Sequence, residues 1–390
     1  MTARFDYDVA IIGGGPAGSS TALHLAKCEG IRPDRLVLLD KARFPRDKPC
    51  AGAVSQLGVD TLERLGVRID VPFVSMRGVR VLFRGDVGET PCAMGIVIRR
   101  TEFDARLVAE ARELGVRVRE KEPLNAIERI PGGFRLGAGA SSLTSRFVAV
   151  CDGAGSTTRK LLGLPEAERK GHLYVLDTPL RPSDDAPARG LIDFDLSVLD
   201  DGLQGYYWDF PTVIDGAVHV SRGIYHANLA PGAEVKASLA SALARRGIDI
   251  ESVKLRPFST RPFVNGSTLA QDGLVLVGEA AGIDRATGEG IGQAIVMGGI
   301  AARHLARALR TGGASFDAYD REVRRSTIGR HMLQSAWLAR RVYGRLGHPA
   351  RRLLLGSTFA RDAAMRWYNG SSLPWSTKVR LGVGLAARAF

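Results

Sequence analysis

The first apolar segments of the chain are two short runs, at residues 9–12 and 36–39, separated by a stretch rich in glycine, alanine and serine. Short continuous apolar runs bounded by turn residues are typical of strands that are buried on both faces of a parallel sheet. The stretch between the runs follows a group of glycines and carries the small and apolar residues of a packed helix. The pattern therefore predicts a strand, helix and strand unit within the first 40 residues.

Later segments show two different hydropathy patterns. The apolar runs at residues 146–151 and 273–277 predict further buried strands. Residues 78–83 and 217–221 instead alternate between apolar and polar side chains, which is typical of an antiparallel sheet with one covered face. A helical pattern opens at residues 287–291. The chain thus combines a parallel α/β lobe with a second, antiparallel lobe.

A glycine-rich turn joins the first predicted strand to its helix, and an acid ends the second strand. Gly13 would make the tight turn, Gly15 would let the backbone approach a pyrophosphate, and Gly18 would let the helix pack against the strand. The diphosphate would rest on the helix N-terminus, where unpaired N–H groups favour negative charge. Asp40 would accept a hydrogen bond from a ribose hydroxyl. The predicted dinucleotide site also includes Pro16, Ala17 and Lys41.

Two later motifs follow buried strands. Asp152 and Gly153 follow the strand at 146–151, and the sequence Gly-Glu-Ala-Ala-Gly at 278–282 follows the strand at 273–277. Together with the first glycine turn, these motifs resemble the three signatures of the flavoprotein hydroxylase superfamily. The resemblance implies FAD as the cofactor, with Asp152 and Gly153 beside the pyrophosphate and the segment from Gly278 at the ribityl chain. The superfamily usually has aspartate at Glu279, so the contact of this longer side chain with the ribityl chain would be altered or would run through a water.

Two more elements resemble the same superfamily. Gly288, Gly290 and Ile291 open a helix, where their backbone N–H groups would face the flavin edge that gathers negative charge on reduction. Arg100 begins an Arg-x-x-Phe-Asp element at the start of a helix predicted to run to residue 111. It is a candidate for the pyrophosphate or the flavin edge, and the alternative is a surface arginine near a helix start.

Two motifs narrow the resemblance to one family. The segment Lys-Pro-Cys-Ala-Gly at 48–52 is similar to the Lys-Pro-Cys-Gly-Gly loop of geranylgeranyl reductases, and residues 206–211 resemble their Tyr-x-Trp-x-Phe-Pro motif. The chain departs from the loop pattern because alanine occupies glycine positions at 51 and 53. The resemblance covers about the whole chain. It implies that reduced FAD reduces carbon–carbon double bonds of an isoprenoid or similar apolar lipid, with Cys50, Tyr206 and Trp208 in the active site.

The alternative function is an FAD-dependent monooxygenase or halogenase acting on an aromatic or polyketide substrate. Halogenases carry Trp-x-Trp-x-Ile-Pro where this chain has Tyr206-Tyr207-Trp208, so the tryptophan pair is absent. They also need a separate lysine, whereas Lys48 belongs to the reductase-like loop. A flavin-binding protein without activity is a more remote alternative, and plain sheet core is the alternative role for the aromatic residues.

Composition agrees with an intracellular two-lobe enzyme. The 390 residues are 45% hydrophobic and 24% charged, which is typical of a globular chain. Four cysteines without metal or disulfide spacing favour a reducing cytoplasm, and Cys28, Cys92 and Cys151 are expected to be small packed residues. No histidine pair has the context of a metal site. No second Gly-x-Gly-x-x-Gly opens a helix, so NAD(P)H would visit the flavin transiently or another reductant would supply the electrons.

The positive charge is concentrated in the last 90 residues. The chain has a net charge of +13, and residues 301–390 hold 17 Lys and Arg against 4 Asp and Glu, which accounts for all of it. Basic helices with aromatic and leucine faces suit an anionic membrane surface, which would make the protein cytoplasmic or peripheral at a membrane. The alternative is that these helices cap the substrate lobe and expose their arginines to water. Nucleic acid is not expected as a partner, because no binding motif accompanies the charge.

These motifs predict the fold class and its organisation. We expect a Rossmann-type α/β FAD-binding domain, an α+β substrate domain built on an antiparallel sheet, and C-terminal helices. The FAD-binding domain is predicted at 1–70, 100–165 and 263–310, the substrate domain at 71–99 and 166–262, and the basic helical region at 311–390.

Overall fold

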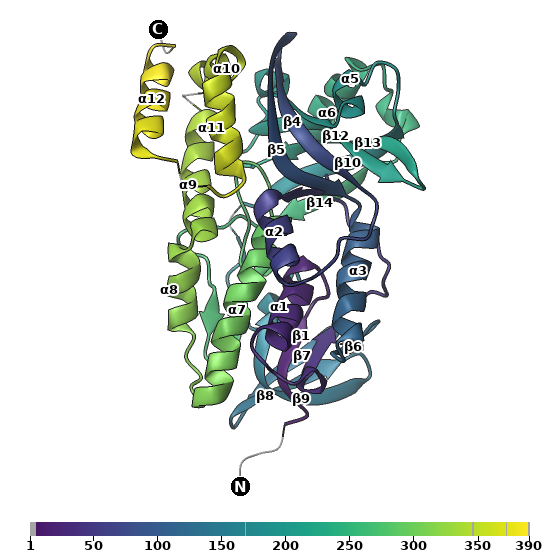
Figure 1. Ribbon diagram of the computed structural model, residues 1–390, viewed down its shortest axis with the longest axis vertical. Coiled ribbons are helices and arrows are strands. Elements are labelled where there is room, and N and C mark those ends of the chain that lie inside the picture. The colour runs from purple at the N-terminus through teal and green to yellow at the C-terminus, as the bar shows by residue number, and fades with distance from the viewer. Residues whose placement is uncertain (1–4, 168, 345–346, 372, 389–390) are drawn as a thin grey trace.

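The computed structural model describes residues 5–167, 169–344, 347–371 and 373–388. Within these residues, two eight-stranded sheets lie one above the other, and helices run along one side of both (Figure 1). The lower sheet contains the N-terminal strand, and the upper sheet carries a long hairpin that reaches the top of the molecule. This arrangement confirms the predicted class, an α/β lobe with a second sheet-based lobe and C-terminal helices.

The lower sheet is built mainly from the buried apolar runs. β1 (Tyr7–Ile12) pairs in parallel with β2 (Leu36–Leu39) on one side and with β9 (Ser141–Val150) on the other. Every residue of β2 is buried, as expected for a strand covered on both faces. The other strands of this sheet are β6 (Arg117–Arg119), β7 (Leu124–Ile130), β8 (Gly133–Ala138), β15 (Ala270–Gln271) and β16 (Leu274–Leu276).

Helices α1 (Pro16–Lys27) and α7 (Ile291–Thr311) pack together beside this sheet, and α3 (Arg100–Glu113) packs against α1. Small residues allow the close approach of α1 and α7: a Cβ added at Gly298 would lie 2.8 Å from the Ser20 hydroxyl oxygen. That hydroxyl donates to the carbonyl of Ile295 at 2.7 Å. The contact therefore fixes the N-terminal part of α7 relative to the glycine turn. The short helix α4 (Thr157–Leu161) follows β9 in the chain.

The upper sheet has the order β14-β10-β13-β12-β11-β4-β5-β3. Its pairs are antiparallel except for β11 with β4, which run parallel. Its strands are β3 (Ala53–Ser55), β4 (Phe73–Phe83), β5 (Asp86–Ile98), β10 (Gly171–Pro179), β11 (Leu191–Asp195), β12 (Gly205–Ile214), β13 (Ala217–His226) and β14 (Arg256–Thr260). β3 belongs to this sheet, although it falls within the range 1–70 that was predicted to bind FAD.

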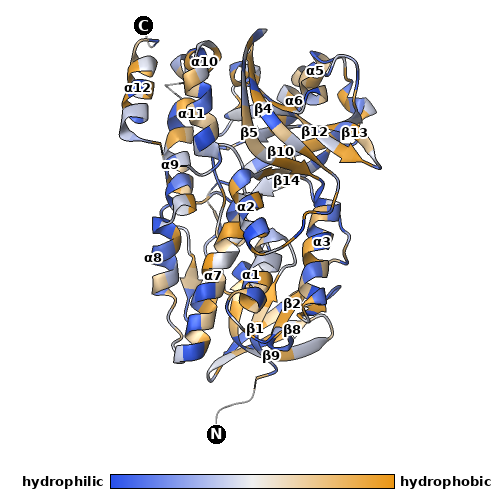
Figure 2. Ribbon diagram, in the orientation of Figure 1, coloured by the Kyte–Doolittle hydropathy of each residue, from blue (hydrophilic) through white to orange (hydrophobic). Residues whose placement is uncertain are grey.

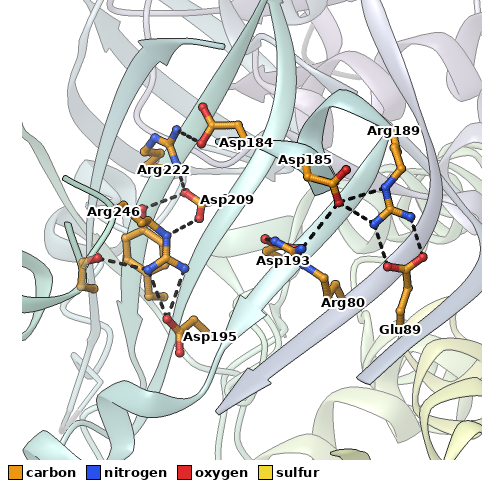
Figure 3. Close-up of polar contacts among 12 residues, drawn as sticks. Arg80, Glu89, Asp184, Asp185, Arg189, Asp193, Asp195, Asp209, Arg222 and Arg246 are labelled. Atoms are coloured by element: carbon orange, nitrogen blue, oxygen red, sulfur yellow. Dashed lines mark hydrogen bonds and ion pairs between the residues drawn. The ribbon is translucent and has the colours of Figure 1, made fainter. Parts of the chain in front are cut away.

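Helix α6 (Val235–Ala244) covers one face of the upper sheet, where Leu239 and Leu243 are fully buried. A network of buried ion pairs lies on the same side. Arg222 of β13 contacts Asp184 and Asp209, and Arg246 joins it through Asp209 (Figure 3). The remaining short elements are α2 (Gln56–Arg64), α5 (Asp185–Ala188), η1 (Pro33–Arg35), η2 (Ser197–Asp201), η3 (Ile250–Ser252) and η4 (Gly278–Ala280).

The C-terminal helices mix hydrophobic and hydrophilic residues along their length (Figure 2). They are α8 (Asp317–Arg325), α9 (Thr327–Val342), α10 (Gly347–Gly356), α11 (Thr358–Tyr368) and α12 (Trp375–Ala386). Helices α10 and α11 pack on the β4–β5 hairpin, and Met332 and Tyr368 are buried, so part of the predicted apolar face covers the protein itself. Helix α12 buries none of its residues. No helix in the described part of the chain is long and apolar enough to cross a membrane.

One expectation about packing is wrong. Cys28 is exposed rather than packed, because it caps the C-terminal end of α1 beyond the buried part of that helix. Cys92 is half-buried and Cys151 is buried. The division into domains stays a prediction, since the two sheets share one continuous set of helices along their side.

Candidate active site

A cavity of about 440 Å³ lies between the two sheets. Its lining includes the glycine turn, the Lys-Pro-Cys loop, the Asp-Gly pair, the segment after β16 and the N-terminus of α7. Motifs that are spread over more than 270 positions of the sequence therefore meet around one space. The residues predicted to bind the cofactor line this cavity, with two exceptions. Gly18 and Gly278 are not among the lining residues, although their neighbours Ala17 and Glu279 are.

The glycine turn is formed as its sequence predicts. Gly13 has a φ of +106°, and a Cβ added there would lie 2.5 Å from the carbonyl oxygen of Cys151. At Gly18 an added Cβ would lie 1.9 Å from the carbonyl oxygen of Gly13. Neither position has room for a side chain. Gly15 instead opens toward the cavity at the N-cap of α1, where no side chain caps the helix and Pro16 occupies its first turn.

Two arginines stand beside Gly15. A Cβ added there would lie 3.5 Å from Nη2 of Arg46 and 3.7 Å from Nη2 of Arg100. Both guanidinium groups are held by Asp104, at 3.2 Å from Arg46 and 2.6 Å from Arg100. Burial lowers the pKa of Arg100, but the charge and hydrogen bonds of Asp104 outweigh it, so the pKa is raised and the group stays charged. The cavity thus offers two cations and a helix N-terminus to a diphosphate.

Sequence reasoning missed Arg46. It lies two positions before the Lys-Pro-Cys-Ala-Gly segment at 48–52, and the run of charged residues at 46–48 was the signal available. The loop between β2 and β3 brings it back onto the start of α3, 58 positions away along the chain, where it meets Asp104.

Asp40 and Lys41 line the end of the cavity beyond β2. One carboxylate oxygen of Asp40 accepts a hydrogen bond from the Gly14 amide at 2.7 Å, and the other accepts from the Ala42 amide at 2.8 Å. Asp40 therefore holds the glycine turn in place. The remaining lone pairs of its oxygens are consistent with the predicted contact to a ribose hydroxyl, which stays a prediction.

The Asp-Gly pair meets two other motifs. Oδ2 of Asp152 accepts from the amide and hydroxyl of Thr158, whereas Oδ1 is buried without a hydrogen-bond partner in the described residues. Lys48 and Glu279 form an ion pair at 3.2 Å, and an added Cβ at Gly153 would lie about 4 Å from both. A buried acceptor without a partner is costly, so Oδ1 of Asp152 fits a hydroxyl or N–H donor of a bound dinucleotide.

The loop at residues 284–290 leads into α7. Asp284 is fully buried, and its Oδ1 accepts hydrogen bonds from the amides of Ala286 and Thr287, while His331 of α9 contacts its Oδ2 at 2.8 Å. Burial raises the pKa of Asp284, but the contacts of His331 and Ser335 outweigh it, and the pKa lies below its ordinary value. Tyrosine hydroxyls hold the carbonyls of the same loop. The pairs are Tyr225 with Arg285 at 2.9 Å, Tyr343 with Ala286 at 2.6 Å, and Tyr206 with Thr287.

Part of the backbone of the 284–290 loop lines the cavity. Gly288, Gly290 and Ile291 all line it, and Gly288 has a φ of +71°. Glu289 turns its carboxyl to the start of α7, where Oε1 accepts from the Gly292 amide at 3.0 Å. Burial raises the pKa of Glu289 to about 7. The predicted backbone site at the helix N-terminus is therefore assembled, with a carboxyl beside it that is neutral in part near pH 7.

An aromatic wall forms the side of the cavity made by the upper sheet. It consists of Phe194 of β11, Tyr206, Trp208 and Phe210 of β12, and Tyr225 of β13. Alternate residues of a strand face the same side of a sheet, which brings the members from β12 together. Phe194 packs edge to face on Tyr206 and Phe210, with ring centroids 5.0 and 5.5 Å apart, and the other neighbouring pairs of the wall are tilted. The indole N–H of Trp208 has no hydrogen-bond partner in the described residues.

Cys50 lines the cavity and is half-buried. Its sulfur accepts a hydrogen bond from the Gly52 amide at 3.4 Å, and a hydrogen bond between Cys50 and Arg100 contributes to the raised pKa of Arg100. Tyr368 of α11 completes the lining. Tyr368 was not singled out from the sequence, since nothing local indicates that α11 packs across the cavity.

Comparisons with known proteins agree with this geometry. A family model described as an FAD binding domain matches residues 6–190. A digeranylgeranylglycerophospholipid reductase from Methanoculleus marisnigri is 28% identical over 346 residues, which cover 83% of this chain and 83% of that protein.

Solved structures share the fold. A geranylgeranyl bacteriochlorophyll reductase-like protein from Thermoplasma acidophilum has a TM-score of 0.71 and 21% identity, covering 98% of this chain and 96% of that one. A flavin-dependent halogenase has a TM-score of 0.64 and 20% identity, covering 98% of this chain and 70% of that one. At these identities, the likeness shows the fold alone.

Proposed function

We propose that this chain is an FAD-dependent oxidoreductase of the geranylgeranyl reductase type, which reduces carbon–carbon double bonds of an isoprenoid or similarly apolar lipid. The FAD binding domain match and the similarity to a digeranylgeranylglycerophospholipid reductase support this proposal. The observation that carries the proposal is the aromatic wall, which shares one cavity with the residues that fit FAD. Such a wall offers an apolar chain a large contact area without a charged group among its members.

FAD, when bound and reduced, supplies a hydride equivalent to one carbon of the double bond. The chain would hold its diphosphate at Gly15 and the start of α1, between Arg46 and Arg100. The backbone of Gly288 and Gly290 would face the flavin edge, and the hydrogen bonds to the 284–290 loop would keep that backbone from moving as charge develops.

The other carbon needs a proton, and we propose Cys50 as its donor. Its thiol lies in the cavity beside the Arg100 cation, which would stabilise the thiolate left behind until water returns the proton. The hydroxyls of Tyr206 and Tyr225 are already donated to backbone carbonyls. An isolated alkene accepts hydride poorly, so proton transfer would run ahead and the aromatic faces would stabilise the positive charge. The alkene gains two electrons and two hydrogens, and the cofactor is oxidised by two electrons.

Two features of the cellular setting belong to the same proposal. The electrons would come from NAD(P)H visiting the flavin or from another reductant. Cysteines in the described residues are all free thiols, which supports a reducing, cytoplasmic setting. We also propose that the enzyme meets its lipid at an anionic membrane surface, because Trp375, Val379 and Val383 expose one apolar stripe on α12 within the basic region.

The decisive experiment is anaerobic reoxidation of the reduced enzyme. The flavin is reduced without oxygen, and isoprenoid lipids, quinones and aromatic metabolites are added separately while flavin absorbance is followed. Reoxidation by a polyprenyl lipid, with a saturated product seen by mass spectrometry, is the expected result. Lack of reoxidation by every polyprenyl compound would contradict the proposal.

A monooxygenase or halogenase is the second candidate, supported by the fold shared with a flavin-dependent halogenase. The same experiment separates the two functions. Turnover of an aromatic substrate that requires oxygen, and incorporates it or a halide into the product, would favour the second candidate.

A further inference from the structure

The N-terminus of α7 is shared by the cavity and by a buried carboxyl. Gly288 and Gly290 line the cavity where the flavin edge is expected. Glu289 stands between them in the chain, lines the same cavity and is 5% exposed. Its Oε1 accepts from the Gly292 amide at 3.0 Å, in the first turn of the helix. A carboxylate at Glu289 therefore draws on the same helix N-terminus that would stabilise charge on the flavin edge.

No cation compensates this carboxyl. In the part of the chain that the structure describes, Glu289 makes no ion pair, and its partners are backbone amides and the hydroxyl of Ser55 at the end of β3. An added Cβ at Gly292 would lie 2.2 Å from the Ser55 oxygen and 2.9 Å from Oε1 of Glu289, so both groups pack against this helix turn. Asp284 of the same loop differs, because His331 contacts it. The reaction proposed above gives Glu289 no role.

Other titratable groups stand around this carboxyl. They are Asp284 with its partner His331 of α9, Tyr368 of α11, and Cys50 with the neighbouring Arg100 of α3, while α2 contacts the helix turn through Gly58. Burial raises the pKa of Glu289 to about 7, against the lowering effect of its bonds to Gly292 and Ser55, and the charge of Asp284 adds to the increase. Burial keeps the pKa of Tyr368 well above its ordinary value, so its hydroxyl stays neutral. Glu289 therefore changes its charge near neutral pH.

We propose that Glu289 takes up a proton when FAD is reduced in this cavity. Reduction gathers negative charge on the flavin edge at the start of α7, and two like charges at one helix N-terminus disfavour each other. A hydride donor such as a reduced nicotinamide gives the cofactor two electrons and one proton, which leaves one negative charge. The proton that Glu289 takes from solvent cancels this charge, and reoxidation releases it.

The uptake is confined to a window of pH. The negative charge of the reduced cofactor raises the pKa of Glu289 above its value of about 7 in the oxidised enzyme. Below the lower of these two pKa values the carboxyl is protonated in both states, and above the higher one it is charged in both. Reduction therefore takes up the extra proton between them, in a window that begins at about pH 7. The inference rests on FAD binding and not on the lipid, so failure of lipid reduction would leave it standing.

The first test follows the midpoint potential of the FAD-loaded enzyme across pH by spectroelectrochemical titration. At about pH 8 the parent should take up about one proton more per two electrons than Glu289→Gln, and at about pH 5 the two should agree. Glutamine keeps an acceptor oxygen for the Gly292 amide but cannot ionise. Glu122→Gln is the matched control and should behave as the parent, because Glu122 lines the same cavity but pairs with Arg119. Equal proton counts in the parent and Glu289→Gln, or equal losses in both variants, would overturn the proposal.

The second test locates the proton. Infrared difference spectra between the reduced and oxidised enzyme at about pH 8 should show a protonated carboxyl that the parent gains and Glu289→Gln does not. Ser55→Ala keeps Glu289 but removes a hydrogen bond that favours its charged form, so the pH window should begin about one unit higher. This variant provides the test if Glu289→Gln does not retain FAD. Absence of the carboxyl signal from the parent, or an unchanged window in Ser55→Ala, would overturn the assignment to Glu289.

Discussion

At the scale of single residues, Gly15 links the backbone to the predicted cofactor. An aspartate there would direct its carboxylate at Arg46 and Arg100, where the diphosphate is expected. We expect Gly15→Asp to fold and to purify without FAD, because its own carboxylate would pair with both arginines. The ratio of flavin to protein absorbance and the melting temperature measure this. Gly266→Asp is the control, since Gly266 is exposed with no neighbouring atom in the way. Stoichiometric FAD in Gly15→Asp would show that the site is misplaced.

A substitution at Cys50 distinguishes a catalytic role of this residue from a role in packing. We expect Cys50→Ala to lower kcat by about 10²-fold, as is typical when a general acid is lost, while KM, FAD content and melting temperature stay nearly unchanged. Cys92→Ala is the matched control, because Cys92 is half-buried and packs against the core of the upper sheet without lining the cavity. An unchanged kcat together with a large fall in melting temperature for Cys50→Ala would assign Cys50 to packing.

At the scale of elements, β12 divides its side chains between two environments. Trp208 and Phe210 face the cavity, whereas Asp209 faces the ion network under α6 (Figure 3). We expect Arg222→Met to lower the free energy of unfolding by about 3–5 kcal/mol, because it leaves the charges of Asp184 and Asp209 buried without this partner. Urea unfolding of the FAD-loaded protein measures it.

The matched control for that network is Arg189→Met. Arg189 pairs with Glu89 and Asp185 in the same view, but 46% of its side chain is exposed (Figure 3). Exposed ion pairs contribute about 0–1 kcal/mol, so this variant should unfold almost as the parent does. Equal losses in the two variants would mean that burial does not set the strength of the network.

Strand β12 also shows what hydropathy leaves undecided. Its first eight residues are all buried, since α6 covers one face and the cavity lies on the other. The alternation that predicts β13 is therefore absent from β12, and only the resemblance of residues 206–211 to a known motif selected Tyr206 and Trp208. Asp209 was not selected, because its partner Arg222 comes from another strand.

At the scale of the whole molecule, the sequence was sufficient for the fold class and for the motifs that meet in the cavity. The fold class and these motifs could be predicted because a glycine turn and a buried strand are specified by residues that are neighbours in sequence. The other parts of the site depend on packing between segments that are distant in sequence. Arg46 reaches Asp104, and Tyr368 enters the cavity, through contacts that no local pattern encodes.

The basic C-terminal region gives a prediction for the whole protein. Trp375, Val379 and Val383 are 79%, 46% and 64% exposed and recur every four residues on α12, so they form one stripe, and Lys378 adds a cation beside it. If this stripe meets anionic lipid, the protein should sediment with vesicles containing phosphatidylglycerol more than with phosphatidylcholine alone. High salt should release it, because screening weakens an attraction of about 1 kcal/mol per basic residue.

Replacing Trp375, Val379 and Val383 together by serine should abolish most of this sedimentation while FAD content and kcat on a detergent-dispersed substrate stay unchanged. Val218→Ser is the control, because Val218 is 44% exposed on the β12–β13 hairpin, outside the basic region. Equal binding to neutral and acidic vesicles would contradict the electrostatic part of the proposal. Full binding by the triple variant would contradict the role of α12, and the arginines of this region would then be a solvated cover over the upper sheet.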